Sequence, residues 1–557
     1  MRFWIILLSS VFVFGQEATP PLDIPLKLSG TFGEFRPTHF HAGIDIKTQG
    51  KEGFEVKAIQ SGSIRRIKIA TSGYGKCLYI EHENGTTSVY AHLKKFASKI
   101  EAFIKTQQYA EEQFLIQRFL PQGEMTVEQG EIIGYSGNTG GSMGPHLHFE
   151  IRETKAEKPL NPLTLNFDIP DSIRPIVQGL YQYPIQRWGA GTKKEISLRR
   201  KNDSTYVANI QNMGGKNGFG IRLFDRQDQS YNRNGVYSAE LYVNGSKRFG
   251  YTFDRIDFSD GKKIDALIDY ATYHEERRRI QKLFNDYGVG YSFISKELPD
   301  GNIDFEEGKS YQVKIILKDY AQNKTQIVFY VEGIAAPFAE EVKVAENTIS
   351  PDKDYLYLYD HHEVYIPKNC FYRPVSLPIV AQKDTLKIEA EQFPQRKGFE
   401  LKFGFSPTLD SLSRQQLCLA KYNPKAKKEK NRLSYVWATK KDSTLHTRSA
   451  YPGTYVLAKD SLPPTIKPLN FRNEQWISNY KYLEFELDDD FSGIQSYRGT
   501  INGKWILLEH EPKDKRLTYD FNDIDFDGAT LNIVLEANDG VGNKQQFSAT
   551  VYRKPKR

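Results

Sequence analysis

Short runs in which apolar and polar residues alternate recur along the whole chain, and this pattern is typical of half-buried β-strands. In the first part of the chain such runs span residues 54–59, 62–69, 78–82 and 87–93. Glycine-containing turns separate the runs, and Asn84-Gly85 is a strong hairpin signal. We therefore expect a mainly β protein whose first domain, over residues 16–165, is built from antiparallel strands.

The pattern changes at residues 167–175, where Pro170 and Pro175 mark a boundary. Short strands with regular turns follow. They predict two β-sandwich domains, over residues 166–335 and 461–557, with a β-rich domain over residues 340–460 between them.

A weak internal repeat links the two predicted sandwiches. Residues 241–247 are echoed by residues 500–504, and residues 319–324 are echoed by residues 539–544. The Asp-x-x-x-Asn turns of this repeat resemble those of bacterial immunoglobulin-like modules, which implies an Ig-like fold for both sandwiches.

Three features of the later part depart from this pattern. Residues 271–284 have helical spacing and charge on most faces, so we expect a solvated helical insertion. Residues 421–432 are basic and contain a proline, which favours an exposed loop over a contact for a wall polymer. The pair His361-His362 has no ligand partner nearby in sequence and is expected on the surface.

The N-terminus has the layout of a secretory signal peptide over residues 1–15. A short positive start, Met1-Arg2, precedes an apolar run that ends in small residues and is short for a membrane span. The alternative is an N-terminal anchor that stays uncut. We expect an exported protein of the periplasm or cell envelope, with no transmembrane segment in the mature chain.

Charge and cysteine content narrow the partners only a little. The net charge of +7 is a small excess for 557 residues, which suits an anionic surface such as a cell-wall polymer or lipid headgroups. No nucleic-acid motif or dense basic stripe is present, so a nucleic-acid partner is excluded. Cys77 is expected to be a buried small hydrophobe, whereas Cys370 and Cys418 either pair or stay free.

Candidate chemistry is concentrated in the first quarter of the chain, which holds six of the eleven histidines. Within residues 140–152, His146 and His148 share one face of a predicted strand, because successive side chains point to opposite faces. The other face carries apolar residues that suit a core. Two imidazoles fixed side by side on a strand are well placed to handle a metal ion and its water.

A second part of a metal site stands earlier in the chain. His41 precedes Asp45 by four residues, and an imidazole with a carboxylate is a common partial set of zinc ligands. A third ligand from His148 would leave the fourth tetrahedral position open for water, as a catalytic zinc requires. His39 is expected to have a supporting or structural role, and His82 to be structural or exposed.

Four motifs in the first domain match one known family in the expected order. They are His41-Ala-Gly-Ile-Asp45, Tyr90-Ala-His92-Leu93, Gly134-Tyr-Ser-Gly-Asn-Thr-Gly140 and Gly144-Pro-His-Leu-His-Phe-Glu150. Together they resemble the lysostaphin-like (LytM-type) zinc metalloendopeptidases, which cut peptide cross-bridges of bacterial peptidoglycan.

The resemblance implies an antiparallel β metallopeptidase domain that acts on peptidoglycan. It also implies that His41, Asp45 and His148 hold Zn²⁺, and that His92 and His146 line the cleft beside the metal-bound water. Envelope proteins that bind through the β domains are possible further partners.

The chain lacks a His-Glu-x-x-His motif, so a glutamate base from that scheme is not available. His92 and His146 are therefore expected to orient or deprotonate the water and to hydrogen-bond the oxyanion, with the division between them left open. The alternatives are a non-catalytic LytM-type regulator or scaffold of cell-wall hydrolases or envelope complexes, and an endopeptidase that cuts an envelope protein.

The chain departs from the family pattern in a helical insert at about residues 97–126. Residues 98–101 have a capping-box layout and begin a helix, and residues 114–120 are strand-like. Two roles are left open for the insert. It forms a wall or lid of the substrate groove, or it packs on the back of the domain or on the next domain.

Overall fold

The computed structural model describes residues 18–186, 189–336, 347–390 and 392–555. Strands make up 46% of the structure and helices 8%, so the prediction of a mainly β protein is confirmed. The predicted signal peptide lies outside the described residues. No helix in the described ranges has both the length and the apolar character needed to cross a membrane.

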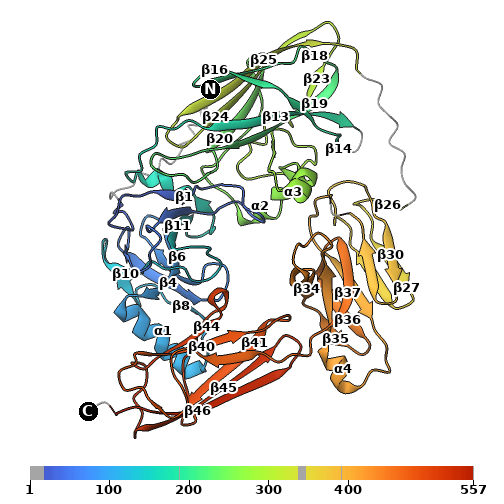
Figure 1. Ribbon diagram of the computed structural model, residues 1–557. Helices are drawn as coiled ribbons and strands as arrows, with labels where there is room; N and C mark the ends of the chain where they lie inside the picture. The colour runs from blue at the N-terminus through green and yellow to red at the C-terminus, as the bar shows by residue number, and fades with distance from the viewer. Residues whose placement is uncertain (1–17, 187–188, 337–346, 391, 556–557) are drawn as a thin grey trace, which may run out of the picture.

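A nine-stranded sheet organises the first region, residues 18–165 (Figure 1). Seven of its strands follow the order β1 (Leu28–Gly30), β2 (Ile44–Lys47), β11 (His146–Glu153), β6 (Thr86–Leu93), β5 (Lys76–Glu81), β4 (Gly62–Ile69) and β8 (Ile116–Phe119). Two short strands add to it, β9 (Thr126–Val127) and β12 (Pro159–Leu160). A small sheet joins β3 (Glu55–Lys57), β10 (Ile132–Tyr135) and β7 (Lys95–Phe96). The strands predicted in this region are therefore present.

Two sheets form the second region, residues 166–336. One contains β14 (Gly189–Ala190), β13 (Ile176–Gln186), β19 (Gly215–Phe224) and β22 (Gln281–Lys282), with β15 (Lys194–Ile196) and β23 (Ile303–Phe305) beside them. The other contains β16 (Leu198–Asn202), β17 (Thr205–Ala208), β25 (Lys324–Gly333), β24 (Ser310–Lys318), β20 (Ser238–Val243) and β21 (Ser246–Thr252), with β18 (Asn212–Met213). Two short helices, α2 (Phe258–Gly261) and α3 (Tyr270–Glu276), lie at the end of the second region that is nearest the first region (Figure 1).

The third region, residues 347–460, holds two five-stranded sheets and one strand pair. The first sheet contains β27 (Tyr355–Tyr359), β28 (His362–Ile366), β32 (Phe399–Gly404), β36 (Thr444–Ala450) and β35 (Thr439–Lys441). The second contains β30 (Ile379–Gln382), β31 (Thr385–Ile388), β37 (Gly453–Lys459), β33 (Leu417–Tyr422) and β34 (Leu433–Val436). The pair is β26 (Thr348–Ile349) with β29 (Val375–Ser376), and one short helix is present, α4 (Ser411–Gln416).

The fourth region, residues 461–555, is again a pair of sheets around one core. One sheet contains β38 (Thr465–Pro468), β40 (Tyr482–Asp488), β44 (Arg516–Asp520) and β43 (Glu509–Glu511). The other contains β39 (Gln475–Trp476), β46 (Lys544–Tyr552), β45 (Thr530–Asp539), β41 (Ile494–Ile501) and β42 (Lys504–Trp505).

The internal repeat is visible in strand order. In the second region β21, β20, β24 and β25 are neighbours, and β25 pairs in parallel with β17. In the fourth region β42, β41, β45 and β46 are neighbours, and β46 pairs in parallel with β39. The first hairpin of each copy turns through Asn-Gly with positive φ at both residues, Asn244-Gly245 and Asn502-Gly503, as a tight two-residue hairpin requires.

Apolar clusters tie the first two regions together. Phe32, Phe35, Phe40 and Ala42 precede β2 in sequence, yet they are buried in the core of the second region rather than in that of the first. Burial of this loop on a second core fixes the backbone on either side of His41. The domain limits drawn from the sequence are not tested by this packing and stay predictions.

The insert begins with helix α1 (Ser98–Glu111), as predicted, but its cap is not the predicted one. The N-cap residue is Ala97, which makes no side-chain cap hydrogen bond. Glu101 instead accepts a hydrogen bond from the backbone N–H of Phe96, at 2.9 Å. The capping-box residues therefore lie one position too far into the helix for a reciprocal pair.

Helix α1 packs against the fourth region, and β8 of the same insert pairs with β4 at the edge of the large sheet away from β1 and β2 (Figure 1). Asp523 accepts hydrogen bonds from Lys105 at 2.6 Å and from Tyr109 at 3.1 Å, and the Tyr109 ring contacts Trp505 edge-on. This placement favours the packing role over the lid, and the module contacted is the last one rather than the next.

Four further expectations need correction or gain detail. Residues 271–284 form a helix only as far as Glu276, and Ile280, Leu283 and Phe284 are buried because their apolar side chains join the cores of the second region. His362 is buried rather than exposed because it begins β28, in which alternate residues are buried, whereas His361 lies in the turn before β28 and is exposed. The cysteines are free and buried, so Cys370 and Cys418 are not paired. Most of residues 421–432 are exposed, as expected of a loop.

Candidate metal centre

The site lies on one face of two neighbouring strands of the large sheet. Asp45 on β2 stands opposite His148 on β11 in the antiparallel register, and β6 lies on the other side of β11. Leu147, Phe149 and Ile151 point to the other face and are buried in the core. The alternation in β11 therefore fixes the histidine face against a rigid apolar layer.

The three residues predicted as zinc ligands converge on one point. His41 Nε2 lies 3.0 Å from Asp45 Oδ1 and 3.1 Å from His148 Nδ1, and the latter two atoms are 2.9 Å apart. All three side chains are buried. The structure thus brings together residues that are up to 107 positions apart in sequence.

Hydrogen bonds on the far side of each ring orient these atoms. His41 Nδ1 donates to the carbonyl of Thr31 at 2.8 Å, which leaves a lone pair on Nε2 of the neutral ring. His148 Nε2 lies 2.8 Å from Glu150 Oε1, so its Nδ1 faces the shared point. Two ring nitrogens and a carboxylate oxygen aimed at one point are the donor set that a borderline-soft divalent cation prefers.

Charges around the site favour a cation at the shared point. Burial alone would raise the pKa of Asp45, but His41 and hydrogen bonds from His146 and His148 hold it well below its usual range. Burial would lower the pKa of His148, yet the carboxylates of Asp45 and Glu150 raise it to about 9. The two carboxylates therefore favour a positive charge on the His148 ring.

The two predicted catalytic histidines flank this group. His92 Nδ1 donates to the carbonyl of Thr139 and His146 Nδ1 donates to the carbonyl of Gly144, each at 2.8 Å. Their ring centroids are 4.8 Å apart, and His146 Nε2 lies 3.4 Å from Asp45 Oδ1. Burial lowers the pKa of His92 to about 3, with His148 and His146 adding to the effect. Both rings therefore keep Nε2 as the atom without an anchoring carbonyl.

Several residues that hold the site were not assigned a role from sequence. Glu150 is fully buried and accepts a hydrogen bond from Arg152 Nε at 2.7 Å and another from the Tyr74 hydroxyl. The Tyr74 ring stacks on His148, with centroids 5.2 Å apart. Alternation along β11 was the available signal, because Glu150 and Arg152 continue the face of His146 and His148.

Arg36 supports the site from the preceding loop. Its Nη2 donates to Asp45 Oδ2 at 2.8 Å, so one carboxylate oxygen is neutralised while Oδ1 faces the histidines. The same Arg36 Nη2 lies 3.4 Å from Glu34 Oε2.

The other two histidines of this region are not part of the group. His39 is exposed, and a Cβ at Gly261 of the second region would lie 3.2 Å from the His39 Cβ. His82 is buried and makes hydrogen bonds with Ser61 O and Ser88 Oγ, which is the structural role expected as one of two possibilities.

A loop from the fourth region contacts the segment that anchors both flanking histidines. Lys513 Nζ lies 3.2 Å from Ser142 O and 3.5 Å from Gly140 O. Ser142 Oγ is 3.1 Å from His146 Nδ1, and Thr139, whose carbonyl anchors His92, precedes Gly140. A residue more than 370 positions away therefore touches the backbone next to the site.

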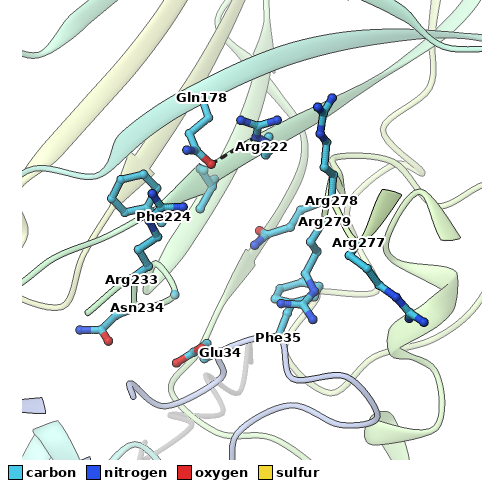
Figure 2. A pocket seen from close by; sticks show the side chains of 13 residues that line it. Glu34, Phe35, Gln178, Arg222, Phe224, Arg233, Asn234, Arg277, Arg278 and Arg279 are labelled. Atoms are coloured by element: carbon cyan, nitrogen blue, oxygen red, sulfur yellow. Dashed lines mark hydrogen bonds between the residues drawn. The ribbon is translucent and has the colours of Figure 1, made fainter. Parts of the chain in front are cut away.

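A basic cavity of about 330 Å³ lies outside the metal centre, between the loop at Glu34-Phe35 and the second region (Figure 2). Five arginines line it, namely Arg222, Arg233, Arg277, Arg278 and Arg279. Arg222 donates to Gln178 at 3.2 Å, and the Arg233 guanidinium lies over the Phe224 ring. None of the five predicted site residues lines this cavity.

Comparison with known proteins covers the same part of the chain. The family model described as Peptidase family M23 matches residues 39–110 and 114–162. These residues contain all three converging side chains and both flanking histidines. The chain carries an M23 peptidase domain. The lysostaphin-like resemblance seen in the motifs is thereby confirmed.

The matches to curated relatives are short compared with the length of either chain. The DD-carboxypeptidase/endopeptidase Mpg of Neisseria meningitidis is 34% identical over 131 residues, which are 24% of each chain. Lysostaphin of Staphylococcus staphylolyticus is 32% identical over 113 residues, 20% of this chain and 18% of that protein. The chain thus spans about a quarter of the length of the curated relatives it matches.

Among solved structures, the catalytic domain of lysostaphin from Staphylococcus simulans is 25% identical, covering 26% of this chain and 93% of that one. Its TM-score is 0.20, so this likeness adds nothing to the assignment.

Proposed function

We propose that this protein is an exported zinc metalloendopeptidase that hydrolyses peptide bonds of bacterial peptidoglycan. The observation that carries the proposal is the convergence of His41 Nε2, Asp45 Oδ1 and His148 Nδ1, with two further histidines beside them, inside an M23 domain. The named relatives Mpg and lysostaphin support a cell-wall substrate.

His41, Asp45 and His148 would hold the zinc ion. They fit it in donor type and number, because structural and catalytic zinc sites use His nitrogens and carboxylate oxygens, and three protein ligands are typical of catalytic sites. When bound, zinc polarises a scissile carbonyl and lowers the pKa of a bound water to about 7.

Glu150, Arg36 and Thr31 keep the ligand side chains in place. Glu150 accepts from His148 Nε2 and Arg36 donates to Asp45 Oδ2, so the outward atoms of both ligands are satisfied. Partners of this kind fix ring orientation and raise the basicity of the ligand.

His92 and His146 move or hold protons beside the ligands. Each has its Nδ1 proton fixed on a backbone carbonyl, so the proton is exchanged at Nε2, which accepts a proton from water or, once protonated, donates to an oxyanion or leaving amine. In His146 this atom lies 3.4 Å from Asp45 Oδ1. The backbone anchors keep both rings in one orientation, so the proton is exchanged at a defined atom.

The basic cavity next to Glu34 supports an acidic substrate. Guanidinium groups bind carboxylates in a bidentate manner, and peptide stems of the cell wall carry free carboxylates. We propose that this cavity binds an anionic group of the polymer away from the cleaved bond.

The test uses the zinc-loaded full chain and purified sacculi, with mass spectrometry of the released muropeptides. Peptide fragments of cross-links or stems are expected, and chelation should abolish their release until zinc is returned. Binding to sacculi without any product would contradict the proposal and favour a non-catalytic scaffold. Cleavage of envelope proteins but not of sacculi would contradict the substrate assignment alone.

A matched variant separates the cavity from the metal centre. Replacing both Arg233 and Arg279 with alanine should raise the KM for sacculi while zinc content and kcat stay unchanged, because neither residue touches the metal ligands. An unchanged KM would refute the role of the cavity without affecting the peptidase proposal.

A further inference from the structure

A second group of ligand-type side chains lies where the M23 domain joins the second region. Asp171, Asp225 and Asp319 each offer an oxygen, and these oxygens all lie within 4.8 Å of one another. The three residues line a cavity of about 310 Å³ together with Thr31 and Phe32 of the first region. The cluster therefore sits at the junction of two regions, in a space large enough for an ion and water.

Two of the three carboxylates are buried without full hydrogen bonding. Asp225 and Asp319 are each 2% exposed. Asp225 Oδ1 and Asp319 Oδ2 have no hydrogen-bond partner among the described residues, although Asp319 Oδ1 accepts from the N–H of Asn323. Buried polar atoms are nearly always satisfied, so each orphan oxygen calls for a ligand.

The charges of the cluster point in the same direction. Burial raises the pKa of Asp225 to about 9 and that of Asp171 to about 7, and the neighbouring carboxylates add to both shifts. Burial raises the pKa of Asp319 to about 6, although hydrogen bonds from Asn323 lower it. Three carboxylates this close are costly to bury unless protons or a cation neutralise them.

The same arrangement occurs again in the fourth region. Asp489 and Asp539 of that region, together with Asp460 at the end of the third region, also offer oxygens within 4.8 Å of one another. The two sets occupy equivalent positions. Asp171 and Asp460 lie shortly before the first strand of a region, and Asp225 and Asp489 directly follow the strand that pairs with it. Asp319 and Asp539 begin the Asp-x-x-x-Asn turn of the repeat.

The hydrogen bonds of the second set also leave an oxygen free. Asp489 Oδ2 accepts from the backbone N–H groups of Phe491 and Gly493, while its Oδ1 has no partner within the described ranges. An accidental meeting of acidic side chains has no reason to recur at equivalent positions of a repeat. The recurrence indicates that the arrangement itself is used.

We propose that Asp171, Asp225 and Asp319 bind a hard divalent cation, with Ca²⁺ as the expected ion. All the donors are carboxylate oxygens, which Ca²⁺ prefers and which lack the nitrogen or sulfur that favours zinc. Two oxygens that each lie about 2.4 Å from one Ca²⁺ are at most about 4.8 Å apart, as these are.

The ion would join segments that are distant in sequence. Asp171 belongs to the linker that follows the M23 domain, Asp225 follows β19, and Asp319 begins the turn between β24 and β25. The backbone carbonyl of Asp171 already accepts from Asn323 of that turn, at 2.9 Å. A cation at this point holds the linker on the second region, and with it the orientation of the M23 domain.

The test is calorimetric titration of CaCl₂ into the full chain, freed of divalent ions and reloaded with one equivalent of Zn²⁺. Wild type is expected to bind Ca²⁺ with a Kd of about 10⁻⁴ to 10⁻³ M, the range of extracellular Ca²⁺-binding modules. Asp225→Asn keeps the shape of the side chain and should bind one Ca²⁺ fewer per chain. Asp304→Asn, on the exposed face of β23, is the matched control and should bind like wild type.

A second measurement does not depend on the variant folding. Tb³⁺ replaces Ca²⁺ and emits when a nearby tyrosine is excited, and Tyr237 and Tyr320 line the cavity. Wild type should show sensitised emission that CaCl₂ quenches. Absence of both Ca²⁺ binding and emission in wild type would overturn the proposal, and so would unchanged stoichiometry in a folded Asp225→Asn protein.

Discussion

The M23 domain and its junction with the second region each bring three ligand-type side chains together, but by different means. In the M23 domain, Asp45 and His148 face each other across one strand pair, and other residues satisfy their outward atoms. At the junction, Asp171, Asp225 and Asp319 come from a linker, a strand end and a turn, and two of their oxygens have no hydrogen-bond partner in the described part of the chain.

The two groups differ in the kind of metal ion that they favour. Mixed nitrogen and oxygen donors on rigid strands favour zinc and leave room for chemistry, whereas carboxylates on connecting segments favour a hard ion that fixes those segments. The first arrangement depends on the order within one sheet, and the second depends on how two regions meet. Variants at the two groups should therefore have separable effects.

The largest effect is expected from His148→Ala. Loss of one of three ligands should reduce bound zinc to below one tenth of an equivalent and the rate of sacculus hydrolysis by about 10³-fold or more. Metal analysis and muropeptide release measure the two effects. Ca²⁺ binding should be unchanged. Retained zinc with full activity would contradict the proposed contrast between the two groups, because His148 would then not be a zinc ligand.

His146→Ala should separate catalysis from metal binding. Its Nε2 is not part of the converging set, so zinc content should stay near one equivalent while kcat falls by about 10² to 10⁴-fold, as for loss of a general acid–base group. His92→Ala should behave similarly. If either variant loses its zinc instead, the division between ligands and proton carriers is wrong.

Glu150→Gln tests the support behind the ligands. The amide keeps the size of the side chain but not its charge, and loss of such a partner typically weakens metal affinity by about 10 to 100-fold. Competition with a zinc chelator measures the shift. Glu124→Gln, at an exposed position of the same domain, is the control and should leave the affinity unchanged.

The smallest effect is expected from Lys513→Ala. This change removes hydrogen bonds to Ser142 O and Gly140 O, worth about 1 kcal/mol in total. If that energy holds the anchors of His92 and His146, kcat should fall about fivefold with zinc content unchanged. Lys515→Ala, on an exposed neighbour that contacts only the fourth region, should have no effect. Equal rates for the two variants would show that the fourth region does not support the site.

The group His41, Asp45 and His148 could be proposed from sequence because the patterns that point to it are local. His41 and Asp45 stand four apart, His146 and His148 alternate on one strand, and the motifs occur in a known order. The acidic cluster could not be predicted from sequence, because its members are separated by long stretches and only Asp319 belongs to a turn with a recognisable sequence signal. Contacts such as that of Lys513 depend on tertiary packing, which no local pattern encodes.

The errors have the same origin on a smaller scale. His361 and His362 do not form one exposed pair, because His362 begins β28 and is buried while His361 lies in the exposed turn before it. Residues 271–284 contain a charged stretch, but Ile280 and Phe284 near their end have enough apolar surface to join a core. In both places individual apolar or strand residues, rather than the average character of the segment, decide which side chains are buried.

The contact between α1 and the fourth region has a consequence for synthesis. A ribosome makes the M23 domain first, yet its helix meets Trp505 and Asp523, and its 139–142 loop meets Lys513. Until that last stretch has emerged, the nascent domain lacks these neighbours. Chains that end before Trp505 would therefore carry all the histidines and the aspartate of the site, but their 139–142 loop would lack the contact with Lys513.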